Sequence, residues 1–227
     1  MNSLSIYQRA LGSDFYRLHP QIQQRFGFSS LDHRACIGRG IMENIWYRKA
    51  FTPFLHLGTM RNIMFPQQGK NVPFTIENYA YVDGFGRETV TWIRKYQFPN
   101  KTRRFDATMV YSERKQNIID YLGTHQHLAV EIELSVAENG GLRLRSKDQY
   151  FYEGWLGFRF PMLFSGFADV CEWYDDEQET FRIEVQVANP RFGRIFGYSG
   201  VFDVEYLSVA PDAVPQDVKP VREEKRD

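Results

Sequence analysis

Arg94 is the residue whose position in the sequence most clearly suggests chemistry. It belongs to the segment Glu88 to Phe98, whose side chains should alternate between two faces as in a β-strand. One face then carries large apolar residues interrupted by one arginine: Val90, Trp92, Arg94, Tyr96 and Phe98. A guanidinium stays charged in proteins, so inside such a face it requires a carboxylate, carbonyl groups or a bound anion. We therefore expect Arg94 to lie inside the protein, where it could anchor the polar end of a ligand.

Two acidic residues are candidate partners for Arg94. Asp148 has the same parity as the apolar and aromatic row of the segment Leu142 to Tyr152, and Asp120 lies in the apolar segment Asn117 to Leu122. Three interpretations stay open: a buried ion pair that fixes strand register, a ligand carboxylate or phosphate that faces Arg94, or a catalytic pair.

Aromatic side chains share the predicted interior with these charges. Such residues either fill an ordinary core or line a ligand cavity, where tyrosine and tryptophan find hydrogen-bond partners. Our candidate ligand-binding set is Trp92, Arg94, Tyr96, Asp120, Asp148, Tyr150, Tyr152, Tyr198 and Phe202. No catalytic residue can be assigned from the sequence.

A second polar group is formed by His125, His127, Glu131 and Glu133, which have one parity on a strand. Imidazoles two residues apart with nearby carboxylates could bind zinc, but a solvated face that pairs with Arg143, Arg145 and Lys147 explains them as well. We favour the solvated face and expect no metal centre. We also expect no cofactor, because the Gly84 to Gly86 turn has no following helix to complete a phosphate site.

Composition restricts the class of protein. The 227 residues include 28 basic and 28 acidic side chains, so no overall attraction to nucleic acid or to an anionic membrane is expected, although local patches can still form. Cys36 and Cys171 are far apart and lack metal-binding spacing, which is typical of a reducing, cytoplasmic compartment. No apolar run is long enough for a membrane span, and no signal peptide is evident, so we expect a soluble chain without processing.

The elements that must position the candidate residues are mostly strands. Residues 5–27 predict short helices with cap residues before them and glycines after them, and Thr52-Pro53 predicts another helix. From Phe74 onward the chain alternates as strands joined by short turns, to Leu207. We predict a mainly β fold: one large curved antiparallel sheet or open β-barrel, formed by a single domain over residues 1–209. Residues 210–227 are rich in proline and charge and predict a disordered tail.

Two local predictions test this interpretation. At the turn after Val136 we expect a three-residue loop, Asn139 to Gly141, which sets Val136 opposite Leu144 and Glu133 opposite Lys147. The segment Trp155 to Gly166 is apolar but interrupted by glycine and proline, and we expect a buried or half-buried connection there.

An ordered set of short motifs resembles a bacterial family, the domain of unknown function 4166. The motifs extend from about Ser5 to Leu207: Tyr7-Gln8-Arg9-Ala10-Leu11-Gly12, Gly38-Arg39-Gly40, Trp92-Ile93-Arg94, Asp120-Tyr121-Leu122-Gly123, Leu156-Gly157-Phe158-Arg159-Phe160-Pro161 and Phe192-Gly193-Arg194-Ile195-Phe196-Gly197. The resemblance implies no established activity. Asp120 stands where the family pattern has glutamate, so a role that depends on the length of that side chain would not carry over.

Three hypotheses follow from these observations. The first is a domain that binds a small amphipathic or apolar ligand on its concave face, with Arg94 as the polar anchor. The second is an enzyme acting on a small carbonyl or lipid-like substrate, which requires an acid with a raised pKa near Arg94 in an open cleft. The third is a structural or protein-interaction module, such as a homodimer formed through a sheet edge or through Trp155 to Gly166.

Overall fold

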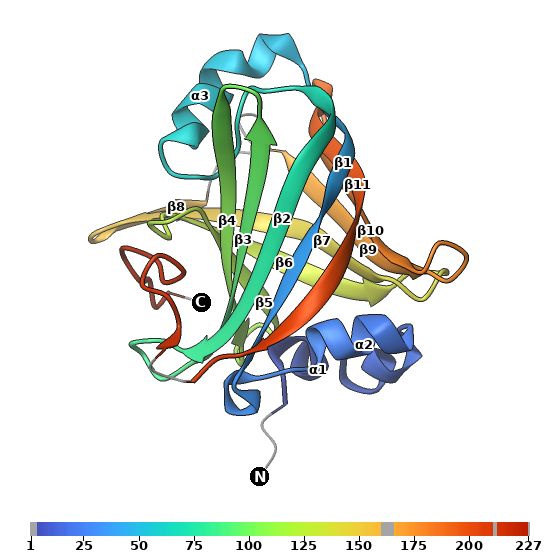
Figure 1. Ribbon diagram of the computed structural model, residues 1–227. Helices are drawn as coiled ribbons and strands as arrows, with labels where there is room; N and C mark the ends of the chain where they lie inside the picture. Colours follow the sequence, from blue (N-terminus) through green and yellow to red (C-terminus); the bar gives the residue numbers. More distant parts are fainter. Residues whose placement is uncertain (1–3, 160–165, 211–212, 227) are drawn as a thin grey trace.

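The protein is a closed antiparallel β-barrel in the computed structural model, which describes residues 4–159, 166–210 and 213–226 (Figure 1). Apart from β8, each strand pairs with the strands before and after it in the chain, so that β7 pairs with β9, and the last strand pairs with the first. Ten strands form the ring, and the short β8 is added to the edge of β7. The strands are β1 (Arg34–Tyr47), β2 (Gly69–Val82), β3 (Glu88–Phe98), β4 (Lys101–Ser112), β5 (Asn117–Leu122), β6 (Leu128–Val136), β7 (Leu142–Glu153), β8 (Leu156–Arg159), β9 (Phe167–Asp175), β10 (Thr180–Asn189) and β11 (Gly193–Ser208). The predicted mainly β architecture is confirmed, and pairing of β1 with β11 closes the sheet that the sequence could have left open.

Closure depends on small residues where β1 and β11 approach each other. Gly40 faces Phe202 in the register of the two strands, and Gly200 faces Met42. A Cβ atom on Gly40 would overlap the carbonyl oxygen of Val201 and the Cα of Phe202. The two backbones therefore approach closely at these glycines, which lie at the seam of the barrel.

Short N-terminal helices, predicted from their caps, are present and cover one end of the barrel (Figure 1). They are α1 (Ile6–Leu11), the 3-10 helix η1 (Gly12–Arg17) and α2 (Pro20–Phe26). Ser5 starts α1 with a capping box, in which its hydroxyl accepts from the Gln8 amide and its own amide donates to the Gln8 side chain. Helices this short are unstable alone in water, so burial of their apolar face in the barrel end stabilises them. The buried residues of these helices are Ile6, Tyr7, Phe15, Ile22, Arg25 and Phe26.

A second helical segment lies at the opposite end (Figure 1). It connects β1 to β2 and contains the 3-10 turn η3 (Lys49–Phe51) and α3 (Thr52–Thr59). Pro53 near the start of α3 agrees with the predicted helix. Another 3-10 turn, η2 (Ser30–Asp32), leads from α2 into β1.

A bulge in β7 decides which of its side chains face inward. Ile132 of β6 faces Ser146, but Val130 faces Gln149, so Lys147 and Asp148 together oppose one residue of β6. This extra residue reverses the alternation along the second half of β7. Side chains predicted to point inward after residue 146 therefore point outward.

The β6–β7 turn differs from the predicted register. Val136 faces Leu142, and Glu133 faces Arg145, with the Ala137 amide donating to the Gly141 carbonyl. The three-residue loop is residues 138–140, one position earlier than predicted, because Ala137 and Gly141 form the closing pair. Each residue of β6 therefore faces a β7 residue two positions earlier than predicted. A shift by two residues keeps the apolar residues on the inner face, so the hydrophobic pattern alone could not detect it.

The segment Trp155 to Gly166 was predicted to be a buried or half-buried connection, but residues 155–159 are exposed. Trp155 is 93% exposed, and Leu156 and Phe158 are each 42% exposed at the tip of the β7–β8 hairpin. Residues 160–165 lie outside the described part of the chain.

Residues after 209 make contacts that the sequence did not predict. Val218 is buried in an outer-face cluster with Ile37 and Ile93, and the Glu224 amide donates to Gln126 Oε1 at 2.6 Å. The domain boundary at residue 209 stays a prediction.

Candidate functional site

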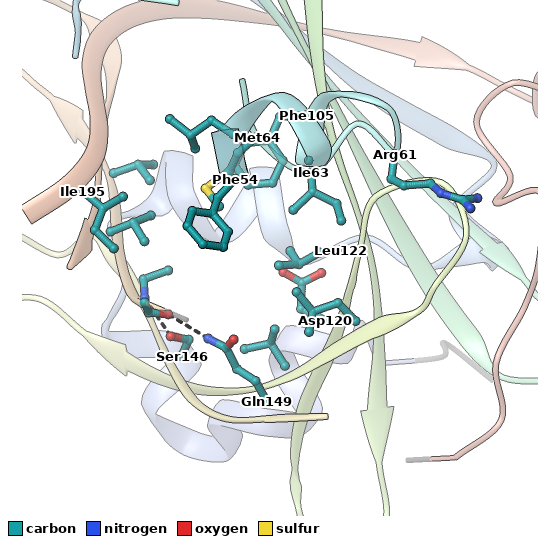
Figure 2. Close-up of a pocket in the computed structure, with 18 of the residues that line it drawn as sticks. Phe54, Arg61, Ile63, Met64, Phe105, Asp120, Leu122, Ser146, Gln149 and Ile195 are labelled. Atoms are coloured by element: carbon teal, nitrogen blue, oxygen red, sulfur yellow. Dashed lines mark hydrogen bonds between the residues drawn. The ribbon is translucent and has the colours of Figure 1, made fainter. Parts of the chain in front are cut away.

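The barrel encloses a cavity of about 870 Å³ that opens beside α3. Its floor is formed by Trp92 and Arg94, and its mouth lies between α3 and the loops that follow β5 and β10. Figure 2 shows Phe54, Ile63 and Met64 on one side of the space, with Asp120, Ser146 and Gln149 on the other. Apolar side chains dominate the lining: Ile63, Met64, Phe105, Met109, Leu122, Leu128, Val130, Ile132, Leu144, Val170, Val187 and Ile195.

Arg94 lies inside the barrel, as the alternation of β3 predicts. It is 4% exposed, donates from Nε to the Phe105 carbonyl at 3.2 Å and from Nη1 to the Tyr198 hydroxyl at 3.2 Å. Its guanidinium also lies 3.8 Å from the centre of the Phe105 ring. The carbonyl and the phenol thus accept two of the hydrogen bonds that the guanidinium can donate, and the ring stabilises part of its charge. Within the described residues no carboxylate is in salt-bridge contact with it, and the group remains a cation that faces the cavity.

Asp120 is the second charged group of the cavity interior. It is 6% exposed on β5, between Met109 and Val130 of the neighbouring strands, which also line the cavity. Its Oδ1 atom is buried without a hydrogen-bond partner among the described residues. Burial raises the pKa of Asp120 to about 7, and the nearby positive charge of Arg94 only partly opposes this shift. Asp120 can therefore exist in either protonation state near neutral pH.

The floor of the cavity is tied to the N-terminal helices. Trp92 is buried on β3, and its Nε1 donates to the Tyr7 hydroxyl at 2.8 Å. The Tyr7 hydroxyl in turn donates to Met109 Sδ at 3.5 Å. These contacts fix the indole in place, so α1 shapes the inner end of the cavity.

The polar side chains of Ser146 and Gln149 on the cavity wall are hydrogen-bonded to backbone groups. The Ser146 hydroxyl accepts from the Ala168 amide at 2.7 Å, and Gln149 Nε2 donates to the Gly166 carbonyl at 2.7 Å (Figure 2). Both bonds join β7 to the start of β9. Asp120 therefore differs from these wall residues in having an oxygen without a partner in the described structure.

The structure brings together only part of the candidate set. Trp92, Arg94 and Asp120 line the cavity, and Tyr198 contacts Arg94 from β11. Tyr96 and Phe202 are buried in aromatic packing, where Tyr96 contacts Tyr198 and Phe202 contacts Phe181. They support the wall and do not line the cavity.

The remaining candidates lie on the outer face, which corrects the prediction for three residues. Asp148 pairs with Arg159, and its side chain is 39% exposed. Tyr150 and Tyr152 stack on each other at 6.2 Å and pack against an outer cluster that contains Tyr121. The β7 bulge is the cause, because it moves these residues to the face opposite Leu144.

The histidine and glutamate group does not converge. Glu131 pairs with Lys115 at 3.1 Å and Glu133 with Lys147 at 3.0 Å on the outer face. His125 and His127 precede β6 and lie at the cavity mouth, where His127 Nδ1 is 2.8 Å from Glu153 Oε2. Among the described residues, no three histidine, cysteine, aspartate or glutamate side chains are grouped as metal ligands.

A buried ion pair that the sequence analysis missed closes the other end of the barrel. Arg25 of α2 and Glu172 of β9 are both fully buried and form a salt bridge. Arg25 also donates to Asn78 Oδ1 at 3.1 Å and to Cys36 Sγ at 3.0 Å. Helical spacing could have identified Arg25, because it shares a face with Ile22 and Phe26.

Fold and site together define an up-and-down β-barrel with a mainly apolar internal cavity and a polar floor. A family model described as domain of unknown function matches residues 18–202, and the chain belongs to this family, DUF4166. The chain is 30% identical over 202 residues to the uncharacterised protein YndH of Bacillus subtilis strain 168, covering 88% of this chain and 97% of that protein.

Comparison with solved structures found no match. In the described residues, no helix has the length and apolar character needed to cross a membrane.

Proposed function

We propose that the barrel binds one small amphipathic molecule, with its polar group at Arg94 and Asp120 and its apolar part along the wall. The cavity volume of about 870 Å³ lies within the range of about 300–1,000 Å³ that is common for ligand sites. Apolar side chains line most of the wall, so an apolar chain or ring system would be stabilised there by burial. The molecule would enter beside α3.

The unpartnered Oδ1 of Asp120 is the observation that carries this proposal. A buried carboxyl oxygen without a donor costs free energy, and a ligand hydroxyl, amide or amine would remove that cost. Arg94 lies near enough to lower the pKa of Asp120 by its charge, so it could orient an acceptor on the same ligand. We therefore favour a ligand whose polar end contains both a donor and an acceptor, such as an alcohol or amide.

Binding of N-phenylnaphthylamine, a neutral dye with one N–H donor that fluoresces in apolar surroundings, tests the proposal. Val170→Trp should fill the cavity and weaken dye binding at least tenfold, and Asp120→Leu should weaken it about tenfold by removing the acceptor. Val82→Trp, on an exposed position of β2, is the matched control and should bind as the natural protein does. Absence of dye binding, together with an empty protein in native mass spectrometry, would refute the proposal.

Acid–base catalysis is the second candidate function, and the pKa of Asp120 of about 7 favours it specifically. A general acid or base works best when its pKa lies near the operating pH, and Arg94 could stabilise negative charge on a carbonyl oxygen. Exchange of the α-protons of a medium-chain ketone in heavy water, followed by NMR, tests this. The natural protein should accelerate exchange and Asp120→Asn should not; equal rates in both would exclude Asp120 as the base.

The cellular compartment of the protein and its oligomeric state are further expectations. Free Cys36 and Cys171 favour a reducing compartment such as the cytoplasm. If a homodimer forms, the exposed Trp155, Leu156 and Phe158 are the surface that would be buried. Light scattering of the natural protein and of Trp155→Ser would show whether the protein is a dimer and whether this surface forms the interface.

A further inference from the structure

Helix α3 and the residue after it carry exposed apolar side chains at the cavity mouth. Leu55 is buried under the helix, whereas Phe54, Leu57 and Met60 are 58%, 63% and 71% exposed. A surface helix normally carries polar residues on its outer face. Phe192 from the neighbouring loop extends this surface and contacts Phe51 at 5.7 Å.

Basic residues surround the apolar face. Arg48, Arg61 and Arg191 are exposed and lie at the cavity mouth, and Lys49 is exposed beside them. The connection 48–68 contains no aspartate or glutamate, and Glu153 is the acidic residue at the mouth, paired with His127.

The opposite end of the barrel has the reverse charge balance. Its turns are residues 83–87, 113–116, 137–141 and 176–179. They carry three basic residues and six acidic ones: Asp83, Glu113, Glu138, Asp176, Glu177 and Glu179. The helical segment over this end, residues 5–33, adds Arg9, Arg17 and Arg25 and the two acids Asp14 and Asp32, so this end carries eight acidic and six basic residues in all. The neutral net charge of the chain therefore contains a modest separation of charge along the barrel axis.

We propose that the mouth of the barrel docks on an anionic lipid bilayer through this surface, which consists of Phe54, Leu57 and Met60 with Arg48, Arg61 and Arg191. Apolar side chains on a short helix enter the boundary between headgroups and acyl chains, and surrounding basic residues are attracted to anionic headgroups. The acidic turns at the far end would be repelled, which orients the molecule with its mouth toward the lipid. We favour a bilayer over a protein partner, because the exposed apolar residues lie at the cavity mouth beside basic residues that anionic headgroups attract.

Docking in this orientation would place the cavity entrance at the acyl region. A lipid-like ligand could then move between bilayer and barrel without crossing water. This extension rests on the proposed ligand binding, whereas docking itself requires only the exposed surface.

Sedimentation with lipid vesicles, without any dye or ligand, tests docking alone. The natural protein should sediment with vesicles of phosphatidylcholine containing about one third phosphatidylglycerol, and much less with phosphatidylcholine alone. Binding should weaken as salt is raised, because screening reduces the attraction of the basic residues.

Paired variants locate the surface. Leu57→Ser with Met60→Ser, and separately Arg61→Gln with Arg191→Gln, should each lower binding to the anionic vesicles at least tenfold. The control, Leu31→Ser with Arg17→Gln, changes an exposed apolar residue and an exposed arginine near the closed end and should bind normally. Circular dichroism would confirm that each variant is folded.

Each alternative outcome is decisive. Failure of the natural protein to bind anionic vesicles, or equal losses in the control, would overturn the proposal. A dimer in light scattering that Leu57→Ser with Met60→Ser dissociates would assign the surface to a second copy instead. Val170→Trp should lose the dye but still sediment with vesicles, so docking and ligand binding can fail independently.

Discussion

Asp120 and Arg94 face the same cavity, but their environments differ. Arg94 has hydrogen bonds to Phe105 and Tyr198 and an aromatic ring beneath it, so its charge is stabilised. Asp120 is surrounded by apolar neighbours and has an oxygen without a donor among the described residues. Two buried groups of opposite charge can thus behave differently, because hydrogen bonding and not proximity alone determines the cost of burying charge.

The stability of the protein should depend on pH through Asp120. Its pKa is raised to about 7 in the folded state, so the unfolded chain releases this proton at lower pH than the folded one does. Its contribution to stability is complete below the unfolded pKa of about 4 and is lost as pH rises toward 7, by roughly 4 kcal/mol. Asp120→Asn, which cannot ionise, should therefore gain stability relative to the natural protein between pH 5 and pH 8.

Urea unfolding of both proteins at pH 5 and at pH 8 measures this difference in the free energy of unfolding. Asp148→Asn is the control, because Asp148 is partly exposed and paired with Arg159, and it should show no comparable gain. A natural protein and an Asp120→Asn variant with parallel pH profiles would contradict the prediction.

The Arg25 and Glu172 pair should be sensitive to loss of one partner. Glu172→Gln would leave the guanidinium buried without a counter-charge, and we expect the free energy of unfolding to fall by about 3–5 kcal/mol. Glu205→Gln breaks the exposed pair with Arg39 and should cost less than about 1 kcal/mol. Chemical denaturation of both variants gives the comparison; similar small losses would show that the buried pair contributes little.

At the scale of elements, the β7 bulge determines the composition of the cavity. One extra residue places Gln149 inside the barrel and Asp148, Tyr150 and Tyr152 outside. A regular strand would have put an acid and two phenols inside, which is the arrangement that simple alternation predicts. The bulge thus removes a second carboxylate from the neighbourhood of Arg94.

The β1–β11 seam should tolerate no side chain at Gly40. Gly40→Ala places a methyl group against the backbone of β11, and we expect a loss of about 1–3 kcal/mol in unfolding free energy. Gly58→Ala in α3 is the matched control, because the nearest atoms belong to Met64 at 3.4 Å and alanine favours helix. Thermal unfolding distinguishes them; an unchanged Gly40→Ala protein would mean that the seam can relax.

At the scale of the whole molecule, closure of the ring creates the cavity. Helices α1 and α2 fill one end, whereas α3 covers the other only partly, so the interior is accessible from one side. Dye at about 100 times its dissociation constant should therefore stabilise the natural protein by about 2.7 kcal/mol against unfolding. Val170→Trp should show no such increase in a thermal melt, and equal increases in both would indicate binding outside the barrel.

The sequence by itself determined the class of fold, the short helices and the inward position of Arg94. These properties follow from local patterns: caps, glycines and the period-two alternation of β3. Asp120 was also identified, because β5 has no irregularity and its apolar neighbours face inward with it.

Only the tertiary structure decided closure of the barrel, the bulge in β7, the Arg25 to Glu172 pair and the size of the cavity. Each depends on contacts between residues far apart in the chain, and a bulge is invisible to alternation because it changes the pairing partner and not the residue types. Whether an inward row of residues fills a core or surrounds a space depends on how many strands close the ring, and that number is fixed only when β1 meets β11.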